Sequence, residues 1–241
     1  MTSGTLYGLG VGPGDPELIT LKAWRILQDA PVIAWPAPEQ GPSMARAIAE
    51  SHIPAGRVEI AIRMPISAAR FPAQAVYDDA AVEISVHLRA GRDVAVLCEG
   101  DPFLYGSFMY LYGRLAAEHE CVVVPGISSL MAAAAASGAP LVARNDVLTV
   151  VPGTLSADDL KARLAGVEAA AILKIGRNLP KVRAVLDDLG LTGCATYVER
   201  ATSPEQKVLS LAEAPADGAP YFSLILVHRR GDAWRVEDGD V

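Results

Sequence analysis

The chain has 241 residues, 51% of them hydrophobic, and its 21 basic and 28 acidic residues give a net charge of −7. This length suffices to bury a real apolar core, and no run approaches the roughly 18 apolar residues that a membrane span needs. The acidic balance argues against nucleic acid as a partner, because nucleic-acid-binding proteins normally carry a basic excess.

The cysteines and the first residues bear on the compartment. Cys98, Cys121 and Cys194 are widely spaced, lie in apolar runs and form no C-x-x-C pair. No basic segment followed by an apolar one opens the sequence. We therefore expect a cytoplasmic protein with reduced thiols and no membrane partner.

The first half of the chain alternates short apolar runs with helical periodicity. Strands are expected at residues 5–10, 32–35, 58–62, 94–98 and 121–124. Helices are expected at about 18–27, 43–50, 73–90, 107–118 and 132–138. The continuous apolar run Val94–Cys98 is typical of a central parallel strand that is buried on both faces.

The second half repeats this alternation. Strands are expected at residues 147–151, 169–175, 195–198 and 222–227, with helices near 156–165 and 179–189. Alternation of strands and helices predicts an α/β fold with mainly parallel sheets. We place a domain boundary in the region 120–145 and divide the chain into 1–125 and 126–241.

A glycine-rich turn at residues 8–16 follows the first strand and precedes a helix, as a dinucleotide-binding loop would. The G-x-G-x-x-G pattern nevertheless fails, because its third glycine position holds Pro13 when it starts at Gly8 and Asp15 when it starts at Gly10. The second strand also lacks the acidic residue that would bind a ribose, and no P-loop motif occurs. A purely structural turn remains the alternative.

Two further turns follow later strands. Gly100-Asp101-Pro102 comes directly after the strongest strand, and Pro125-Gly126 precedes Ser128 and Ser129. The carboxyl ends of parallel strands are where open α/β sheets bind ligands, and hydroxyl groups at a helix start either cap the helix or bind a ligand. Each turn alone could be structural, but three at one sheet edge predict a binding site.

The three segments together resemble the tetrapyrrole methyltransferases, the class III S-adenosylmethionine-dependent methyltransferases. The family pattern G-x-G-P-G-D-x-x-L-x-T-x-x-A stands here at residues 10–23. The pattern G-D-P-x-x-Y/F-G stands at 100–106, and V-P-G-x-S-S at 124–129. Their order and spacing match the family along the whole chain.

The segments 6–18, 98–110, 173–178 and 197–202 look like the branch of the family that methylates C-20 of precorrin-2. Relatives that methylate uroporphyrinogen usually have glycine where Glu99 stands. The resemblance implies formation of precorrin-3A in cobalamin biosynthesis, with S-adenosyl-L-methionine converted to S-adenosyl-L-homocysteine. It also implies a homodimer of two-domain subunits, with cofactor and substrate in the inter-domain cleft. Methylation of the cobalt-containing factor II remains an alternative.

The resemblance also implies which residues contact the cofactor. By position these are Pro13, Gly100, Asp101, Leu104, Tyr105, Ser107, Ser128, Ser129, Ile175 and Ala201. The uroporphyrinogen enzymes often have methionine where Ile175 stands and glycine where Ala201 stands, so backbone contact is expected at these two positions.

The tetrapyrrole carries many carboxylates, so cationic side chains are expected to bind it. We expect Lys174 and Arg177 in this role, with Asp15 contacting hydroxyl or pyrrole N–H groups or simply capping a turn. Further candidates, for each of which a surface or ion-pair role is equally plausible, are Arg63, Arg144 and Arg200. The four histidines show neither zinc-site nor triad spacing, and no metal is expected.

Methyl transfer from a sulfonium is an in-line displacement that depends on alignment more than on acid–base help. The reduced macrocycle is electron-rich enough to act as the nucleophile, so we assign no catalytic residue. Other family members such as diphthine synthase and a non-catalytic ligand sensor remain alternatives. A nucleotide-dependent oxidoreductase is disfavoured by the failed dinucleotide pattern.

Overall fold

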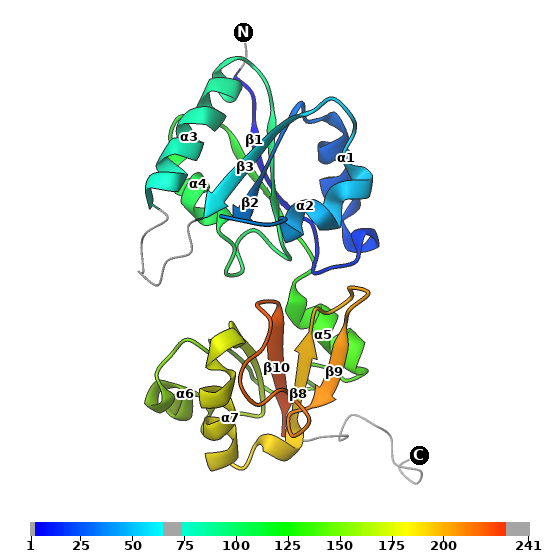
Figure 1. Cartoon of the computed structure of the whole chain (residues 1–241), viewed down its shortest axis with the longest axis vertical. Helices are drawn as coiled ribbons and strands as arrows, with labels where there is room; N and C mark the ends of the chain where they lie inside the picture. The colour runs from blue at the N-terminus through cyan, green and yellow to red at the C-terminus, as the bar shows by residue number, and fades with distance from the viewer. Residues whose placement is uncertain (1–2, 65–73, 230–241) are drawn as a thin grey trace. The chain divides into compact units, whose positions relative to one another are not determined.

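A computed structural model of the chain describes residues 3–64 and 74–229 (Figure 1). The chain forms two compact units, Met1–Ser128 and Ser129–Val241. Each unit contains one five-stranded sheet with helices packed against it. The predicted two-part α/β architecture is confirmed.

The first unit contains an entirely parallel sheet. Its strands are β1 (Leu6–Gly10), β2 (Val32–Pro38), β3 (Val58–Met64), β4 (Val94–Cys98) and β5 (Cys121–Val124). They are arranged in the order β3-β2-β4-β1-β5, and each neighbouring pair is parallel. All five strands therefore end at the same edge of the sheet.

Helices cover both faces of this sheet (Figure 1). The helical segments are η1 (Pro16–Leu18), α1 (Leu21–Asp29), α2 (Met44–Ala49), η2 (Glu50–His52), α3 (Gln74–Arg89) and α4 (Phe108–Leu115). Val94, Val96 and Cys98 pack on the side of α3 and α4. Ala95 and Leu97 pack on the side of α1 and α2. Because both faces are covered, every residue of β4 is buried, as its continuous apolar run predicted.

The second unit contains a mixed sheet. Its strands are β6 (Leu148–Pro152), β7 (Ala169–Leu173), β8 (Ala195–Glu199), β9 (Lys207–Ser210) and β10 (Ser223–His228), in the order β6-β7-β10-β8-β9. β6 and β7 are parallel, whereas β10 is antiparallel to both β7 and β8, and β9 is antiparallel to β8. β6, β7 and β8 consequently run in one direction and end at a common edge.

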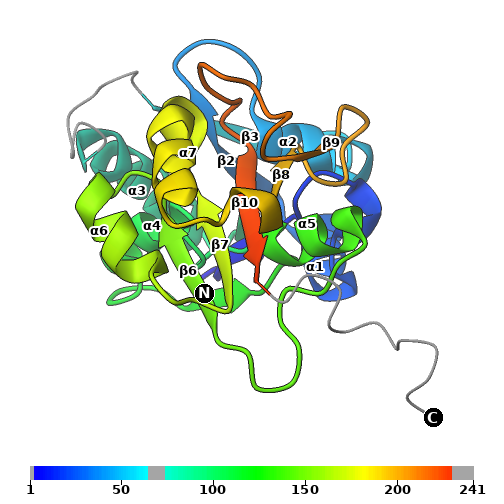
Figure 2. The same cartoon turned by 90° about the horizontal axis from the view of Figure 1, so that it is seen from below.

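The helices of the second unit also lie on both faces of its sheet (Figure 2). They are α5 (Ser129–Ser137), α6 (Ala157–Leu164), η3 (Gly176–Asn178), α7 (Leu179–Asp188) and η4 (Thr192–Cys194). α6 and α7 pack with Tyr197 and Ile225 in one apolar cluster, and α5 packs with Val198 and Leu224 in another. The sequence pattern missed β9, because its four residues are partly exposed and show no run of apolar side chains.

All three cysteines are free thiols, and burial raises the pKa of the fully buried Cys98 well above its ordinary value. Among the described helices, none is long and apolar enough to cross a membrane.

The turns after β1, β4 and β5 pack backbone against backbone. A Cβ atom at Gly126 would lie 2.0 Å from the carbonyl oxygen of Gly100, and one at Gly10 would lie 2.4 Å from the Cα of Gly126. The Gly100 N–H also donates to the Gly12 carbonyl at 2.8 Å. Glycine at these positions therefore lets the three turns converge at the edge where the strands end.

This packing predicts a large loss of stability for Gly126→Ala. The added methyl would collide with a backbone oxygen that cannot move without shifting β4, so we expect the free energy of unfolding to fall by about 2–4 kcal/mol. The matched control is Gly113→Ala in α4, where a Cβ would meet nothing within 4 Å. The control should gain about 0.5–1 kcal/mol. Urea unfolding measures both, and equal stability of the two variants would contradict the packing argument.

Candidate functional site

The edge where the strands of the first sheet end gathers most of the expected cofactor residues. β4, β1 and β5 are neighbours and parallel, so the turns that follow them lie side by side. These turns carry the expected contacts of the first unit, Pro13, Gly100, Asp101, Leu104, Tyr105, Ser107 and Ser128. The sheet order thus brings together residues that are more than a hundred positions apart in the sequence.

The Asp101 carboxylate accepts backbone hydrogen bonds from two of these turns. Its Oδ1 accepts hydrogen bonds from the backbone N–H groups of Phe103 and Leu104, at 2.9 and 3.0 Å. Its Oδ2 accepts from the N–H of Gly126 at 3.1 Å. The structure therefore supports the turn-stabilising role of Asp101, which an Asp-Pro turn already favours.

Asp15 serves in a similar way in the first turn. Its Oδ1 accepts from the N–H of Glu17 at 2.8 Å and caps η1, whose first residue is Pro16. Proline suits the first helical position because its missing N–H has no helical partner there. The capping alternative for Asp15 is therefore the one that the geometry supports.

Three large side chains after β4 are exposed. Phe103, Leu104 and Tyr105 are 48%, 39% and 41% exposed. Tyr105 also adopts a φ of 56°, a left-handed conformation that costs a residue with a Cβ roughly 1–2 kcal/mol. Such strain persists only where the surroundings impose it and is concentrated at functional sites. The three side chains together form an exposed apolar surface at the carboxyl edge of the sheet.

Glu99 has a structural contact that the sequence pattern did not reveal. Its Oε1 accepts a hydrogen bond from the N–H of Ala45 at 3.2 Å, in the first turn of α2. Burial raises the pKa of this carboxyl above its ordinary value. Glu99 therefore ties the turn after β4 to α2, a contact that no local pattern signals because the residues are far apart in the chain.

A depression beside α2 is lined by Trp35, Arg46 and Arg63. Arg46 forms ion pairs with Glu59 at 2.9 Å and Glu50 at 3.2 Å, so its charge is already balanced. Arg63 is exposed and donates to a backbone carbonyl at 3.2 Å. Of these two arginines, Arg46 is therefore the less available to an anionic ligand.

The second sheet positions the remaining expected residues. Lys174 follows β7 and Arg200 follows β8, and these two strands end at the same edge. Both residues have positive φ, 55° and 47°. Arg177 lies in η3, shortly after Lys174 in the sequence, and is exposed. Arg144 instead precedes β6 and lies toward the opposite edge, so it does not join this group.

Ile175 and Ala201 directly follow Lys174 and Arg200, the two basic residues with positive φ. Ile175 is fully buried and Ala201 is 7% exposed, and both side chains belong to apolar clusters. Any ligand contact at these two positions would therefore involve mainly the backbone, and such contact stays a prediction. Ser129, the tenth expected cofactor residue, is the first residue of α5.

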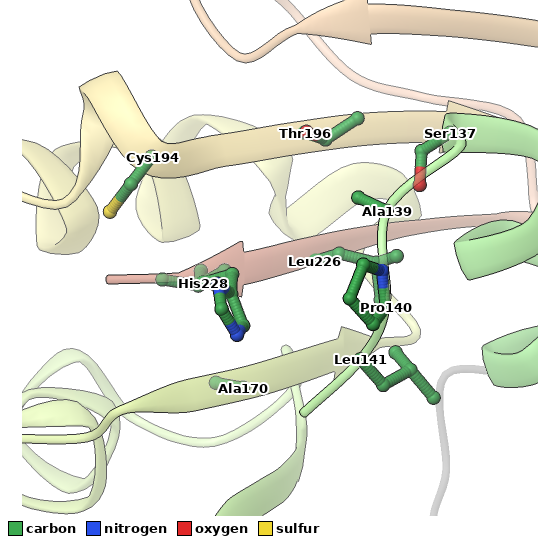
Figure 3. Close-up of a pocket in the computed structure, with 10 residues that line it drawn as sticks. Ser137, Ala139, Pro140, Leu141, Ala170, Cys194, Thr196, Leu226 and His228 are labelled. Carbon is green, nitrogen blue, oxygen red and sulfur yellow. The ribbon is translucent and has the colours of Figure 1, made fainter. Parts of the chain in front are cut away.

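A small cavity in the second unit lies away from these residues (Figure 3). It holds about 30 Å³ and is lined by Cys194, Thr196 and His228 at the opposite edge of the sheet from Lys174. This is room for roughly one water molecule. His228 Nε2 lies 3.5 Å from the Asp146 carboxylate. Over residues 3–64 and 74–229, no group of three His, Cys, Asp or Glu side chains could hold a metal ion.

Comparison with known proteins gives one family and several relatives. The model of the tetrapyrrole (corrin/porphyrin) methylases matches residues 5–215. The cobalamin biosynthesis protein CobIJ of Mycobacterium tuberculosis is 44% identical over 93% of this chain, which spans about half (46%) of that relative. The precorrin-2 C(20)-methyltransferase of a Sinorhizobium species is 43% identical, with 93% of this chain and 95% of the relative covered.

Further similarities extend to a more distant relative and to a solved structure. The cobalt-precorrin-2 C(20)-methyltransferase of Salmonella typhimurium is 30% identical over 95% of this chain and 98% of its own. The uroporphyrin-III C-methyltransferase of Thermus thermophilus, solved with S-adenosylhomocysteine, superposes with a TM-score of 0.67 at 26% identity, covering 93% and 97% of the two chains. The family match over most of the chain agrees with the three turns and the sheet edge that they occupy, and the chain belongs to the tetrapyrrole (corrin/porphyrin) methylase family.

Proposed function

We propose that this chain methylates C-20 of precorrin-2 to give precorrin-3A in cobalamin biosynthesis. The observation that carries the proposal is the 43% identity to a precorrin-2 C(20)-methyltransferase over nearly the full length of both chains. Glu99 supports the same branch, because it stands where uroporphyrinogen methylases usually have glycine. The Salmonella relative favours one alternative, methylation of the cobalt-containing substrate.

The turns of the first unit suit S-adenosylmethionine. The exposed side chains of Leu104 and Tyr105 offer an apolar surface for a flat ring, and Ser107 and Ser128 bring hydroxyl groups to the same edge. Apolar walls with a few placed polar groups are typical of cofactor sites. When bound, this cofactor supplies an electrophilic methyl group. Pro13, Gly100 and Asp101 would shape its site in the first unit, and the resemblance to the family also assigns Ser129, Ile175 and Ala201 to cofactor contact.

The substrate's carboxylates would be bound by Lys174, Arg177 and Arg200, which lie on one edge of the second sheet. The chain's role in the reaction is to orient two ligands and exclude water, since an aligned displacement gains most of its rate from proximity. No residue is assigned as a base. We also propose that the protein is a cytoplasmic homodimer, and the exposed apolar residues Val82, Val86 and Met109 on α3 and α4 agree with a further subunit contact.

The proposed reaction predicts the transfer of one methyl group to precorrin-2. Incubating the protein with S-adenosylmethionine labelled in its methyl group, and with precorrin-2 with or without cobalt, should give one labelled methyl on the metal-free tetrapyrrole. Mass spectrometry of the product measures this transfer. Faster labelling of the cobalt form would favour the alternative substrate, and labelling of neither form would contradict the proposal.

The backbone hydrogen bonds of Asp101 predict a specific loss of cofactor affinity in Asp101→Asn. Whichever way the amide is oriented, its N–H₂ would face a backbone N–H in place of an acceptor, at Gly126 or at Phe103 and Leu104, so the two turns would be held less firmly. We expect the Kd for S-adenosylhomocysteine, measured by calorimetry, to rise about tenfold. The control is Asp78→Asn, which removes only an exposed ion pair with Arg114 and should leave the Kd unchanged. Equal Kd values for both variants would refute this role.

Burial of Glu99 predicts a pH-dependent difference in stability between the wild type and Glu99→Gln. Because the folded-state pKa is raised, ionisation of Glu99 destabilises the fold as the pH rises from its ordinary value of 4.5 through the raised value. Glutamine keeps an acceptor for Ala45 and carries no charge. The variant should therefore gain stability relative to the wild type as the pH rises above 4.5 in urea unfolding. A difference that does not change with pH would contradict the assignment.

A further inference from the structure

A buried carboxylate lies at the carboxyl end of β8. Glu199 is 3% exposed, and both of its oxygens have partners. Oε2 accepts from the Tyr197 hydroxyl at 2.8 Å, and Oε1 accepts from the Lys207 ammonium group at 3.3 Å. A buried carboxyl group without partners would be very costly, so these contacts offset the cost of burying Glu199 in the sheet.

The carboxylate connects three strands. Glu199 is opposite Lys207 on β9 and opposite Ser223 on β10. The Tyr197 hydroxyl also lies 3.3 Å from the Ser223 hydroxyl. Burial raises the pKa of Tyr197 to about 12, so this phenol stays protonated and donates to Glu199 at physiological pH. The four side chains form one polar cluster, which we call the Glu199 cluster.

The turn that follows Glu199 is strained. Arg200 and Thr202 have φ values of 47° and 68°, and they flank Ala201. Left-handed conformations are unfavourable for residues with a Cβ and persist only where neighbouring contacts impose them. The Arg200 N–H donates to the carbonyl of Phe222 at 2.8 Å, and the Thr202 N–H donates to the side chain of Gln206 at 2.6 Å. The turn is thus held at several points, and the Glu199 cluster lies at its base.

We propose that Glu199 is a positioning residue, whose contacts with Tyr197 and Lys207 hold the turn at 200–203 so that the backbone of Ala201 meets the cofactor. The inference rests on the proposed function, in which Ala201 is a cofactor contact. Apolar residues of similar volume often stabilise a fold as well as a buried ion pair does. We therefore assign the carboxylate a role in geometry, because its two oxygens bind Tyr197 on β8 and Lys207 on β9 just before the strained turn.

The test compares two cluster variants with a control in the same unit. Glu199→Gln removes the charge, and Tyr197→Phe removes only the hydroxyl. The control is Leu164→Ala at the end of α6. It leaves a cavity in the apolar cluster that also contains Tyr197, but away from the turn. We expect Glu199→Gln to raise the Kd for S-adenosylhomocysteine about tenfold, and Tyr197→Phe to raise it less. Amide hydrogen exchange of Arg200 and Thr202 should become faster in both. The control variant should have a lower melting temperature. Its Kd for S-adenosylhomocysteine and its amide hydrogen exchange rates in the turn should be those of the wild type.

The outcomes separate this inference from the proposed function. If the wild type binds S-adenosylhomocysteine and both cluster variants keep its Kd and exchange rates, Glu199 is merely structural and the inference is overturned. If the wild type does not bind this ligand, the proposed function fails and the inference fails with it. Should Glu199→Gln not fold, Lys207→Gln is the milder variant, because the Lys207 side chain is 59% exposed. A severalfold rise in its Kd is then expected, and an unchanged Kd overturns the inference.

Discussion

The close approach of three backbone turns is the constraint on which the first unit's site depends. Gly10, Gly100 and Gly126 leave no room for a Cβ between them, and the Asp101 carboxylate closes the gap between two of the turns. The glycines therefore serve first to let backbone contact backbone, and the proposed cofactor surface depends on that contact. Any side chain at these positions would push apart the turns that follow β1, β4 and β5.

Inward-facing carboxylates hold the turns in both units. Glu99 follows β4 and accepts from α2, and Glu199 ends β8 and accepts from Tyr197 and Lys207. Each directly precedes a segment that the family pattern assigns to the cofactor. Methyl transfer depends above all on the alignment of the two reactants. A chain whose buried carboxyl groups position turns is consistent with a site to which no catalytic base is assigned.

Strained residues mark the same regions. Tyr105, Lys174 and Arg200 have positive φ, and each lies just beyond the end of a strand. Arg144 shares this conformation but lies toward the opposite edge of its sheet. Strain alone is therefore not specific to the proposed site, and what Tyr105, Lys174 and Arg200 share beyond it is their place at a carboxyl edge.

The sequence by itself determined the α/β class, nearly all of the strands and helices, and the family, because apolar periodicity and the three motifs are local. It did not determine that Asp101 and Glu99 bind backbone in distant segments, that β9 exists, or that β10 runs antiparallel between β7 and β8. It also could not show that Arg144 lies away from Lys174. Only the tertiary structure decides these points, because strand direction, strand order and long-range hydrogen bonds depend on which segments meet in space, and periodicity along the chain carries no record of that.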